Sequence, residues 1–163
     1  MEETIIIRTI EPTDNAILAS IIRTSLEEFN ANKPGTVYFD ETTDNLYQLF
    51  SSTDKSIYFV AEENGKILGG GGIFPTENLP EGFCELVKMY LTKNARGKGL
   101  GRKMLEHCLQ AAKDLGYTTV YLESMPELST ALKVYEKLGF EYINFSLGRS
   151  GHCGCDIWMQ KKL

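Results

Sequence analysis

The sequence predicts an α/β protein with a mixed β-sheet that carries helices on both faces. Segments rich in β-branched residues alternate along the chain with segments whose apolar residues recur every three or four positions. The resulting order, β-α-α-β-β-β-α-β-α-β-β, contains both hairpins and strand-helix-strand units. Nothing in the 163 residues marks a linker, a repeat or a low-complexity segment, so we expect a single domain over residues 1–163.

Each element follows from a local pattern. β-branched and aromatic residues predict the strands, and a capping residue before an apolar stripe of helical period predicts the helices. Glycines are expected to end two helices, at Gly116 and Gly139. In chain order we predict a strand at residues 4–10, a helix from the cap at 12–14 to 29, a loop at 30–39, a shorter helix at 40–50, strands at 56–61, 66–74 and 83–91, a helix at 99–115, a strand at 118–122, a helix at 127–138, and strands at 140–147 and 154–161.

Four consecutive glycines, residues 69–72, lie inside one predicted strand. Glycine weakens a strand interior and usually marks a β-bulge or a close backbone approach. Two interpretations stay open, a structural bulge and a floor against which substrate lies. In the following strand, simple alternation predicts two faces: Glu85, Val87, Met89 and Leu91 on one, and Leu86, Lys88 and Tyr90 on the other.

Composition and charge indicate a cytoplasmic protein that binds neither nucleic acid nor membranes. The chain is 42% hydrophobic with a net charge of -5. Its first apolar run is too short for a signal peptide, and no segment reaches the roughly 20 apolar residues of a membrane span. The four cysteines show no framework spacing, so we predict reduced thiols: Cys84, Cys108, Cys153 and Cys155.

A glycine-rich turn follows the strand at residues 83–91 and opens the next helix. The first amides of a helix have no intrahelical partner, and the helix dipole adds partial positive charge, so phosphate binds well there. Gly97, Gly99 and Gly101 remove side chains that would hold a ligand away from the backbone. The same turn carries four cations: Arg96, Lys98, Arg102 and Lys103. A basic cluster on an acidic chain predicts a site for an anionic ligand.

The spacing of this turn separates its possible interpretations. A dinucleotide fingerprint needs G-x-G-x-x-G, and a Walker A loop needs Ser or Thr where Gly99 follows Lys98. The segment from Arg96 to Gly101 instead resembles the R/Q-x-x-G-x-G/A pyrophosphate loop of the GNAT superfamily of acyl-CoA-dependent N-acyltransferases. Residues 131–140 resemble the family's A-x-x-L-Y-x-K-x-G-F signature, with Val134 in place of leucine.

The resemblance covers most of the predicted order and is most specific over residues 85–140. It implies a mostly antiparallel GNAT-like sheet and an N-acetyltransferase that moves an acetyl group from acetyl-CoA to an amine, by direct transfer in a ternary complex. A catalytically silent acyl-CoA sensor is the alternative. The implied cofactor-binding residues are Met89, Tyr90, Leu91, Arg96, Gly97, Lys98, Gly99, Leu100, Gly101, Arg102 and Tyr135. Leu128 stands where the family often has an asparagine, which removes one side-chain contact with the cofactor.

The acceptor implied by the resemblance is an amine of a small molecule or a protein, and a symmetric homodimer is the default expectation. A lysine-like amine is neutral at pH 7 only about once in 2,500 molecules, which adds about 4.6 kcal/mol to the barrier. A base is therefore expected. Glu85 lies eleven residues before Arg96, where the histone-acetyltransferase branch has its glutamate base, and Glu123 or water is a rival.

Tyr135 and His152 complete the predicted site. The resemblance implies that Tyr135 stands near the cofactor sulfur and protonates the thiolate, although periodicity alone makes it a core aromatic. His152 lies near a predicted terminal hairpin, where it could touch substrate together with Glu85. Cys153 and Cys155 would share a strand face, yet nothing nearby supplies a second pair of ligands, so we predict no metal.

Overall fold

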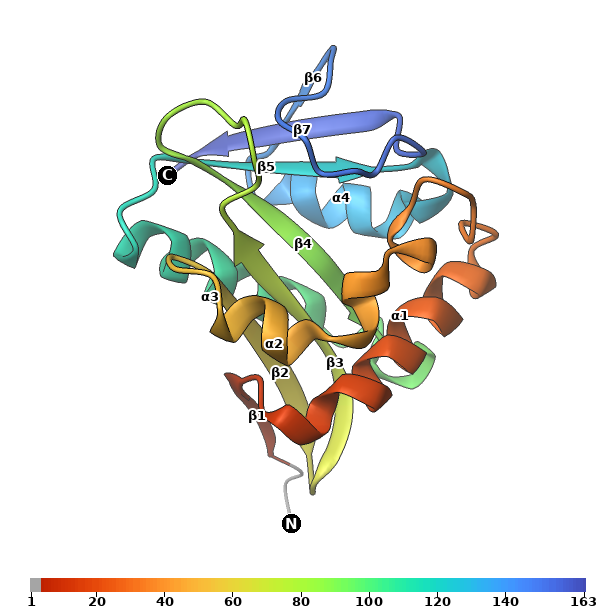
Figure 1. Ribbon diagram of the computed structural model, residues 1–163. Coiled ribbons are helices and arrows are strands. Elements are labelled where there is room, and N and C mark those ends of the chain that lie inside the picture. Colours follow the sequence, from red (N-terminus) through yellow and green to blue (C-terminus); the bar gives the residue numbers. More distant parts are fainter. Residues whose placement is uncertain (1–3) are drawn as a thin grey trace.

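The backbone forms a seven-stranded sheet in the order β1-β2-β3-β4-β5-β7-β6 (Figure 1). This computed structural model describes residues 4–163, so the acidic start of the chain lies outside the described residues. β4 and β5 pair in parallel, and the other neighbouring strands pair antiparallel. The strands are β1 (Ile5–Thr9), β2 (Ile57–Glu63), β3 (Lys66–Phe74), β4 (Phe83–Leu91), β5 (Thr119–Ser124), β6 (Glu141–Ile143) and β7 (Ile157–Lys162). The predicted mixed, mostly antiparallel sheet is confirmed.

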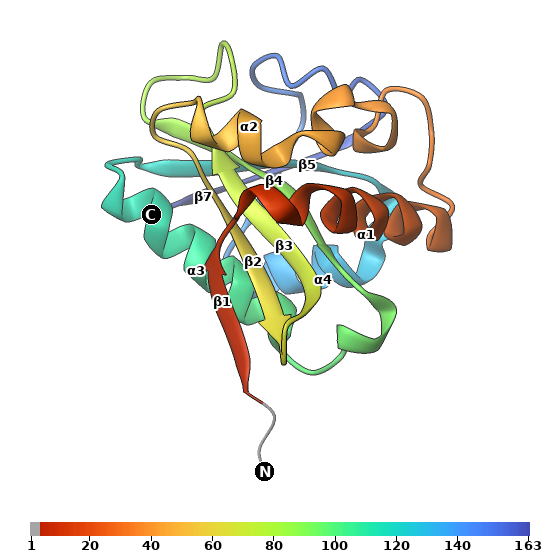
Figure 2. The same cartoon turned by 60° about the horizontal axis from the view of Figure 1, so that its bottom comes forward.

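Helices cover both faces of this sheet, as predicted (Figure 2). The apolar stripes of α1 (Asn15–Glu28) and α2 (Leu46–Ser51) bury Leu18, Ile22 and Phe50 against one face. The other face is covered by α3 (Leu100–Asp114) and α4 (Ser129–Lys137). Within the described part of the chain, no helix is long and apolar enough to cross a bilayer. The three- and four-residue spacing of apolar residues in the predicted helix includes Ile17 in its apolar stripe. In the structure Ile17 is 48% exposed, because it lies beside the β2–β3 turn, outside the main stripe.

The predicted helix at residues 40–50 is wrong in its first half. The chain forms a 3-10 turn at Glu41–Asp44 before α2 begins at Leu46. Asp40 caps this turn, because its Oδ1 accepts hydrogen bonds from the backbone N–H and hydroxyl of Thr42 at 2.9 and 2.7 Å. Asn45, with φ of -133°, separates the turn from the helix. Local side-chain bonding therefore outcompetes one continuous helix.

The two predicted C-terminal strands are also shorter than expected. β6 covers only Glu141–Ile143, and residues 144–156 form a long loop. Tertiary bonds fix this loop: the Leu147 amide donates to the side-chain hydroxyl of Tyr121 in β5 at 3.0 Å, and the Gly154 amide donates to the Gly35 carbonyl at 2.7 Å. These bonds replace strand pairing and bring the loop next to the segment that follows α1.

A β-bulge in β4 breaks the predicted alternation of that strand. Gly70 pairs with Tyr90 while Gly72 pairs with Val87, so Lys88 and Met89 together stand opposite one residue of β3. Lys88 adopts a φ of +51°, which is uncommon for a residue with a side chain. Consequently Val87 and Tyr90 pack toward α1, whereas Leu86 and Met89 pack toward α3 and α4. Predicting Val87 and Met89 on one face was wrong because the extra residue reverses the pleat.

The glycine run in β3 makes room for one aromatic ring. A Cβ on Gly70 would lie 2.5 Å from Tyr58 Cε1, and one on Gly72 would lie 2.7 Å from Tyr58 Cδ2. The buried Tyr58 hydroxyl donates a 2.8 Å hydrogen bond to the Lys88 carbonyl, inside the bulge. Gly70 and Gly72 therefore contribute to the β4 bulge indirectly, because they leave room for the Tyr58 ring, whose hydroxyl bonds to the bulge.

Tyr58→Phe is expected to lower the free energy of unfolding by about 1–3 kcal/mol, because it leaves the buried Lys88 carbonyl without a partner. Urea denaturation followed by circular dichroism would measure this loss. Tyr142→Phe removes a hydroxyl from a side chain that is 51% exposed and should change stability by less than about 0.5 kcal/mol. Equal stabilities of the two variants would contradict the role given to Tyr58.

Candidate active site

A cleft opens where the two parallel strands separate. β4 and β5 pair only from Phe83↔Thr119 to Glu85↔Tyr121, and beyond this point both strands continue without pairing to each other. Residues 85–91 of β4 line one side of a cavity of about 300 Å³, and residues 122–125 line the other. The backbone of β4 beyond Glu85 therefore offers an unpaired edge to a ligand that lies extended between the strands.

The glycine-rich turn closes one end of this cleft. Gly97, Gly99, Gly101 and Arg102 line it, and Gly99 is the N-cap of α3 with a φ of +81°. A Cβ on Gly99 would meet no atom within 4 Å, so the turn is open toward the ligand space. The Leu100 side chain is buried beside Met104. Among the predicted cofactor-binding residues, Lys98 and Leu100 do not line the cleft.

Arg96 lines the cleft, but its guanidinium is already bonded within the protein. It donates to the Glu28 carboxylate at 2.7 Å, to the Ser25 hydroxyl at 3.1 Å and to the Leu91 carbonyl at 3.1 Å. It also lies 4.8 Å from the centre of the Phe29 ring. These contacts tie the glycine-rich turn to α1, and they occupy the carbonyl of Leu91, one of the predicted pantetheine contacts.

Tyr135 of α4 lines the middle of the cleft, together with Met89, Tyr90 and Leu91. Its ring packs 5.8 Å from that of Phe140, and its side chain belongs to the core under α3 and α4. Burial raises the pKa of Tyr135 to about 12, so the phenol is protonated at neutral pH. The structure therefore unites the two interpretations of this residue, a core aromatic whose ring also borders the ligand space.

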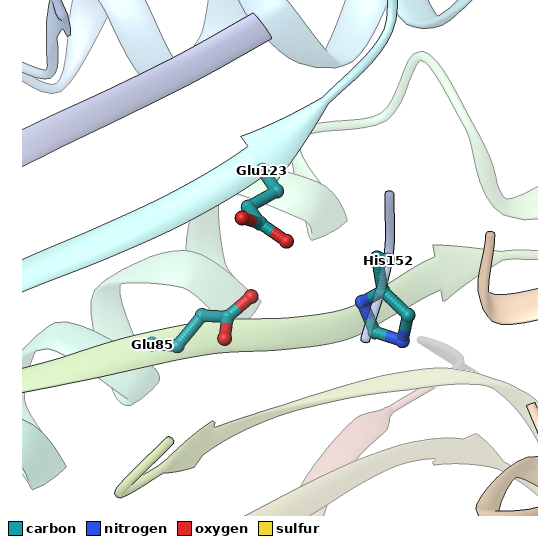
Figure 3. A group of neighbouring side chains, drawn as sticks. All are labelled: Glu85, Glu123 and His152. Carbon is teal, nitrogen blue, oxygen red and sulfur yellow. The ribbon is translucent and has the colours of Figure 1, made fainter. Parts of the chain in front are cut away.

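Three polar side chains converge at the other end of the cleft (Figure 3). Glu85 comes from β4, Glu123 from β5 and His152 from the long loop before β7, and one ligand atom of each lies within 4.8 Å of the others. Two carboxyl groups and an imidazole could also serve a metal, so the absence of a metal stays a prediction. Sequence analysis proposed all three residues for the acceptor site, and the fold brings them together.

Glu85 is 2% exposed and accepts a 2.6 Å hydrogen bond from the Thr76 hydroxyl. Burial, with a smaller contribution from the nearby Glu123 carboxylate, raises the pKa of Glu85 to about 8 against the opposing effects of the Thr76 hydrogen bond and the Lys88 charge. Glu123 accepts hydrogen bonds from the hydroxyls of Tyr121, at 2.6 Å, and Ser150. The two carboxyl groups thus differ in their surroundings, and Glu85 holds its proton at neutral pH.

Asp40 and Lys88 adjoin the candidate site through His152, a position that the sequence did not predict. The Asp40 carboxylate lies 3.1 Å from Lys88 Nζ and 3.0 Å from His152 Nε2. Burial opposes its ionisation, but the His152 hydrogen bond and the Lys88 charge outweigh that effect and hold the pKa of Asp40 well below its usual range. No local motif marked Asp40, because its partners are distant in sequence and the bulge alone turns Lys88 toward it.

The fold and the cleft are those of an N-acetyltransferase domain, and comparison with known proteins agrees with this class. Residues 20–140 match the Acetyltransferase (GNAT) family. The chain is 38% identical over 160 residues to the uncharacterised N-acetyltransferase YjgM of Escherichia coli, covering 97% of this chain and 95% of that protein. It is 30% identical over 136 residues to human N-acetyltransferase 8, covering 80% of this chain and 57% of that protein. The chain therefore belongs to the GNAT family of acetyltransferases.

Solved structures share the fold at low sequence identity. A GNAT-family acetyltransferase from Staphylococcus aureus superposes with a TM-score of 0.86 at 19% identity, over 98% of this chain and 99% of that one. YncA, an acetyltransferase from Salmonella typhimurium solved with its cofactor acetyl-CoA, superposes with a TM-score of 0.72 at 21% identity, over 98% of this chain and 94% of that one. The family prediction made from the two motifs is confirmed.

Glu85→Gln is expected to change the pH dependence of stability. The native carboxyl holds its proton up to about pH 8, whereas the unfolded chain releases it near pH 4.3. Between these values the native state binds more protons, so the contribution of Glu85 to the free energy of unfolding falls as pH rises. The stability of the variant relative to wild type should therefore be greater at about pH 8.5 than at about pH 5. Urea denaturation at both pH values measures it, and an identical difference at both would contradict the raised pKa.

Proposed function

We propose that the protein transfers an acetyl group from acetyl-CoA to an amine by direct attack in a ternary complex. The observation that carries the proposal is the separation of β4 from β5. The cleft that this separation opens runs from the glycine-rich start of α3 at one end to the cluster of Glu85, Glu123 and His152 at the other. Membership of the GNAT family and the fold shared with an acetyl-CoA complex support this reading. We further propose a cytoplasmic location and a homodimer as the working assembly.

The donor would lie along β4. Backbone groups of Met89 and the N–H of Leu91, whose carbonyl is bonded to Arg96, would pair with the pantetheine arm. The first amides of α3, from Gly97 to Arg102, would hold the pyrophosphate. Each charge-assisted hydrogen bond contributes about 1.5–3 kcal/mol, so a few of them suffice to anchor the cofactor. Arg96 would contribute by holding the turn, since its guanidinium is bonded to Glu28 and Ser25.

The acceptor amine would lie between the thioester and the carboxyl groups. The Glu123 carboxylate suits an ammonium group, and the cluster would supply the base. Glu85 is one candidate, although it is ionised in only about one molecule in ten at pH 7. After attack on the carbonyl carbon, the carbon–sulfur bond breaks and Tyr135 would donate its phenolic proton to the thiolate. A small-molecule or protein amine fits this chemistry equally.

A catalytically silent acyl-CoA sensor is the second candidate, because such a protein needs only the part of the cleft proposed to bind acetyl-CoA. The convergence of Glu85, Glu123 and His152 on one point favours an enzyme, since a sensor has no use for a titratable cluster beyond the thioester. Release of free thiol from acetyl-CoA, screened across pools of amines, separates the two. Thiol release with one pool supports the enzyme, and binding of acetyl-CoA without release supports the sensor.

Gly99→Glu is expected to abolish acetyl-CoA binding measured by calorimetry, because the new carboxylate would stand in the proposed pyrophosphate position. Gly116→Glu is a matched control at the other end of α3. Both glycines have a positive φ, +81° and +91°, and neither has an atom within 4 Å of a new Cβ. The control should therefore bear a similar strain and still bind. Equal acetyl-CoA binding by the two variants would contradict the proposed pyrophosphate site.

Tyr135→Phe is expected to lower kcat by about 10²-fold or more while the Kd for acetyl-CoA stays within about twofold, because a general acid is lost without loss of ring packing. The assay uses the amine that gives the fastest thiol release. Tyr142→Phe, on an exposed tyrosine, is the control. An unchanged kcat in Tyr135→Phe would contradict the general-acid role of Tyr135 and leave it a purely structural one.

A further inference from the structure

Asp40 fixes the protonation of His152. Its carboxylate accepts bonds from Lys88 Nζ and from Thr42, and it is ionised, as its lowered pKa indicates. An ionised carboxylate only accepts hydrogen bonds, so the His152 Nε2 that lies 3.0 Å from it must carry a proton. In a neutral imidazole the other nitrogen, Nδ1, then has a free lone pair.

This free nitrogen faces the acceptor end of the cleft. Figure 3 shows one ring nitrogen of His152 on the side of the two carboxyl groups and the other directed away from them. Since Nε2 is bonded to Asp40, the nitrogen on the cleft side is Nδ1. The His152 side chain is 10% exposed and lines the cavity, and its backbone amide is bonded to the Ser150 hydroxyl at 3.1 Å. The Asp40 bond therefore orients the ring, and the Ser150 bond fixes the backbone that carries it.

The neighbouring carboxyl groups are less suited to take a proton at neutral pH. Glu85 already holds its own proton up to about pH 8. Both oxygens of Glu123 accept hydroxyl hydrogens, one from Tyr121 and one from Ser150. An imidazole with an unoccupied nitrogen and a carboxylate behind it has the arrangement of a general base whose tautomer is set by its partner.

We propose that His152, oriented by Asp40, takes the proton from the acceptor amine, an inference that rests on the proposed acetyl transfer. An N–H bond of the ammonium breaks and an N–H bond forms at His152 Nδ1. The free amine then attacks the carbonyl carbon of acetyl-CoA, and the carbon–sulfur bond breaks. The thiolate takes a proton from Tyr135, the second amine proton replaces it, and the imidazolium returns its proton to solvent.

Asp40 is a positioning residue in this scheme. It stabilises the imidazolium that forms during turnover, and Lys88 holds it in place at 3.1 Å. Lys88 reaches Asp40 because the bulge gives it a φ of +51°. The strand that would bind the pantetheine arm thus also sets the position of the base, which links donor binding to deprotonation of the acceptor.

The two histidines of the chain make the tautomer directly measurable. His107 Nδ1 lies 2.9 Å from the Lys103 carbonyl, which can only accept, so His107 carries its proton on Nδ1. Two-bond ¹⁵N–¹H correlation spectra of the full chain should therefore show opposite tautomers, with signals assigned by His107→Gln and His152→Gln. A His152 proton on Nδ1, pointing into the cleft, would overturn the proposal without any assay of activity.

Kinetics provide the second test, with the amine that gives the fastest thiol release. His152→Ala should lower kcat by about 10²–10⁴-fold while calorimetry shows unchanged acetyl-CoA binding, and added imidazole should restore part of the rate. His107→Ala should match wild type. Asp40→Asn should lower kcat and move the His152 Nε2 proton signal upfield, as its partner loses charge.

The outcomes separate this inference from the proposed function. A wild-type rate in His152→Ala overturns the role of His152 and leaves acetyl transfer intact, with Glu85→Gln then expected to lose activity instead. Loss of activity in His152→Ala without rescue by imidazole overturns the base role in favour of a structural one. Failure of wild type to release thiol with any amine, despite binding acetyl-CoA, overturns the transferase itself and with it the need for a base.

Discussion

The hydrogen bond from the Tyr58 hydroxyl to the Lys88 carbonyl is the interaction on which the site depends. The Tyr58 side chain belongs to the core on the α1 side of the sheet and stabilises the bulge from there. The bulge turns Lys88 toward Asp40 and Met89 toward α3. A bulge also increases the local twist of a strand. β4 leaves β5 just before this point, after Glu85. The buried Tyr58 hydroxyl therefore supports both the β4 edge proposed to bind acetyl-CoA and the end of the cleft proposed to bind the acceptor amine.

Local motifs could be predicted from the sequence, and tertiary contacts could not. The glycine-rich turn and the segment around Tyr135 each carry their signature within about ten residues, so their resemblance to the GNAT family, and the cofactor site that it implies, could be found from the sequence. Asp40 carries no such signature, because its function comes from contacts with Lys88 and His152, 48 and 112 residues away. The glycine run predicted a bulge in β3, and one lies at its start, where Ala61 pairs with Gly69 but Glu62 pairs with Ile67. The second bulge, in β4, had no local signature, since Gly70 and Gly72 accommodate the ring of Tyr58 in β2.

The two ends of the cleft differ in charge, and each end is complementary to the ligand group proposed for it. One end has the positive pole of α3 and the side chain of Arg102, while the other has Glu85, Glu123 and His152. Arg96, the most buried cation of the turn, is neutralised by Glu28 and so shapes the backbone more than it attracts a ligand. An acidic chain can thus hold an anion at one end and a cation at the other without a strongly charged surface.

Two loops that are far apart in sequence enclose the acceptor end as one unit. The Gly154 amide bonds to the Gly35 carbonyl, His152 Nε2 lies 3.0 Å from the Asp40 carboxylate, and a Cβ on Gly35 would stand 2.7 Å from Cys153 Sγ. Because the backbones meet this closely, neither loop can accept a larger residue at the contact unless the other gives way. Grafting the acceptor preference of a relative onto this scaffold would therefore require residues 30–45 and 144–156 to be transplanted as a matched pair.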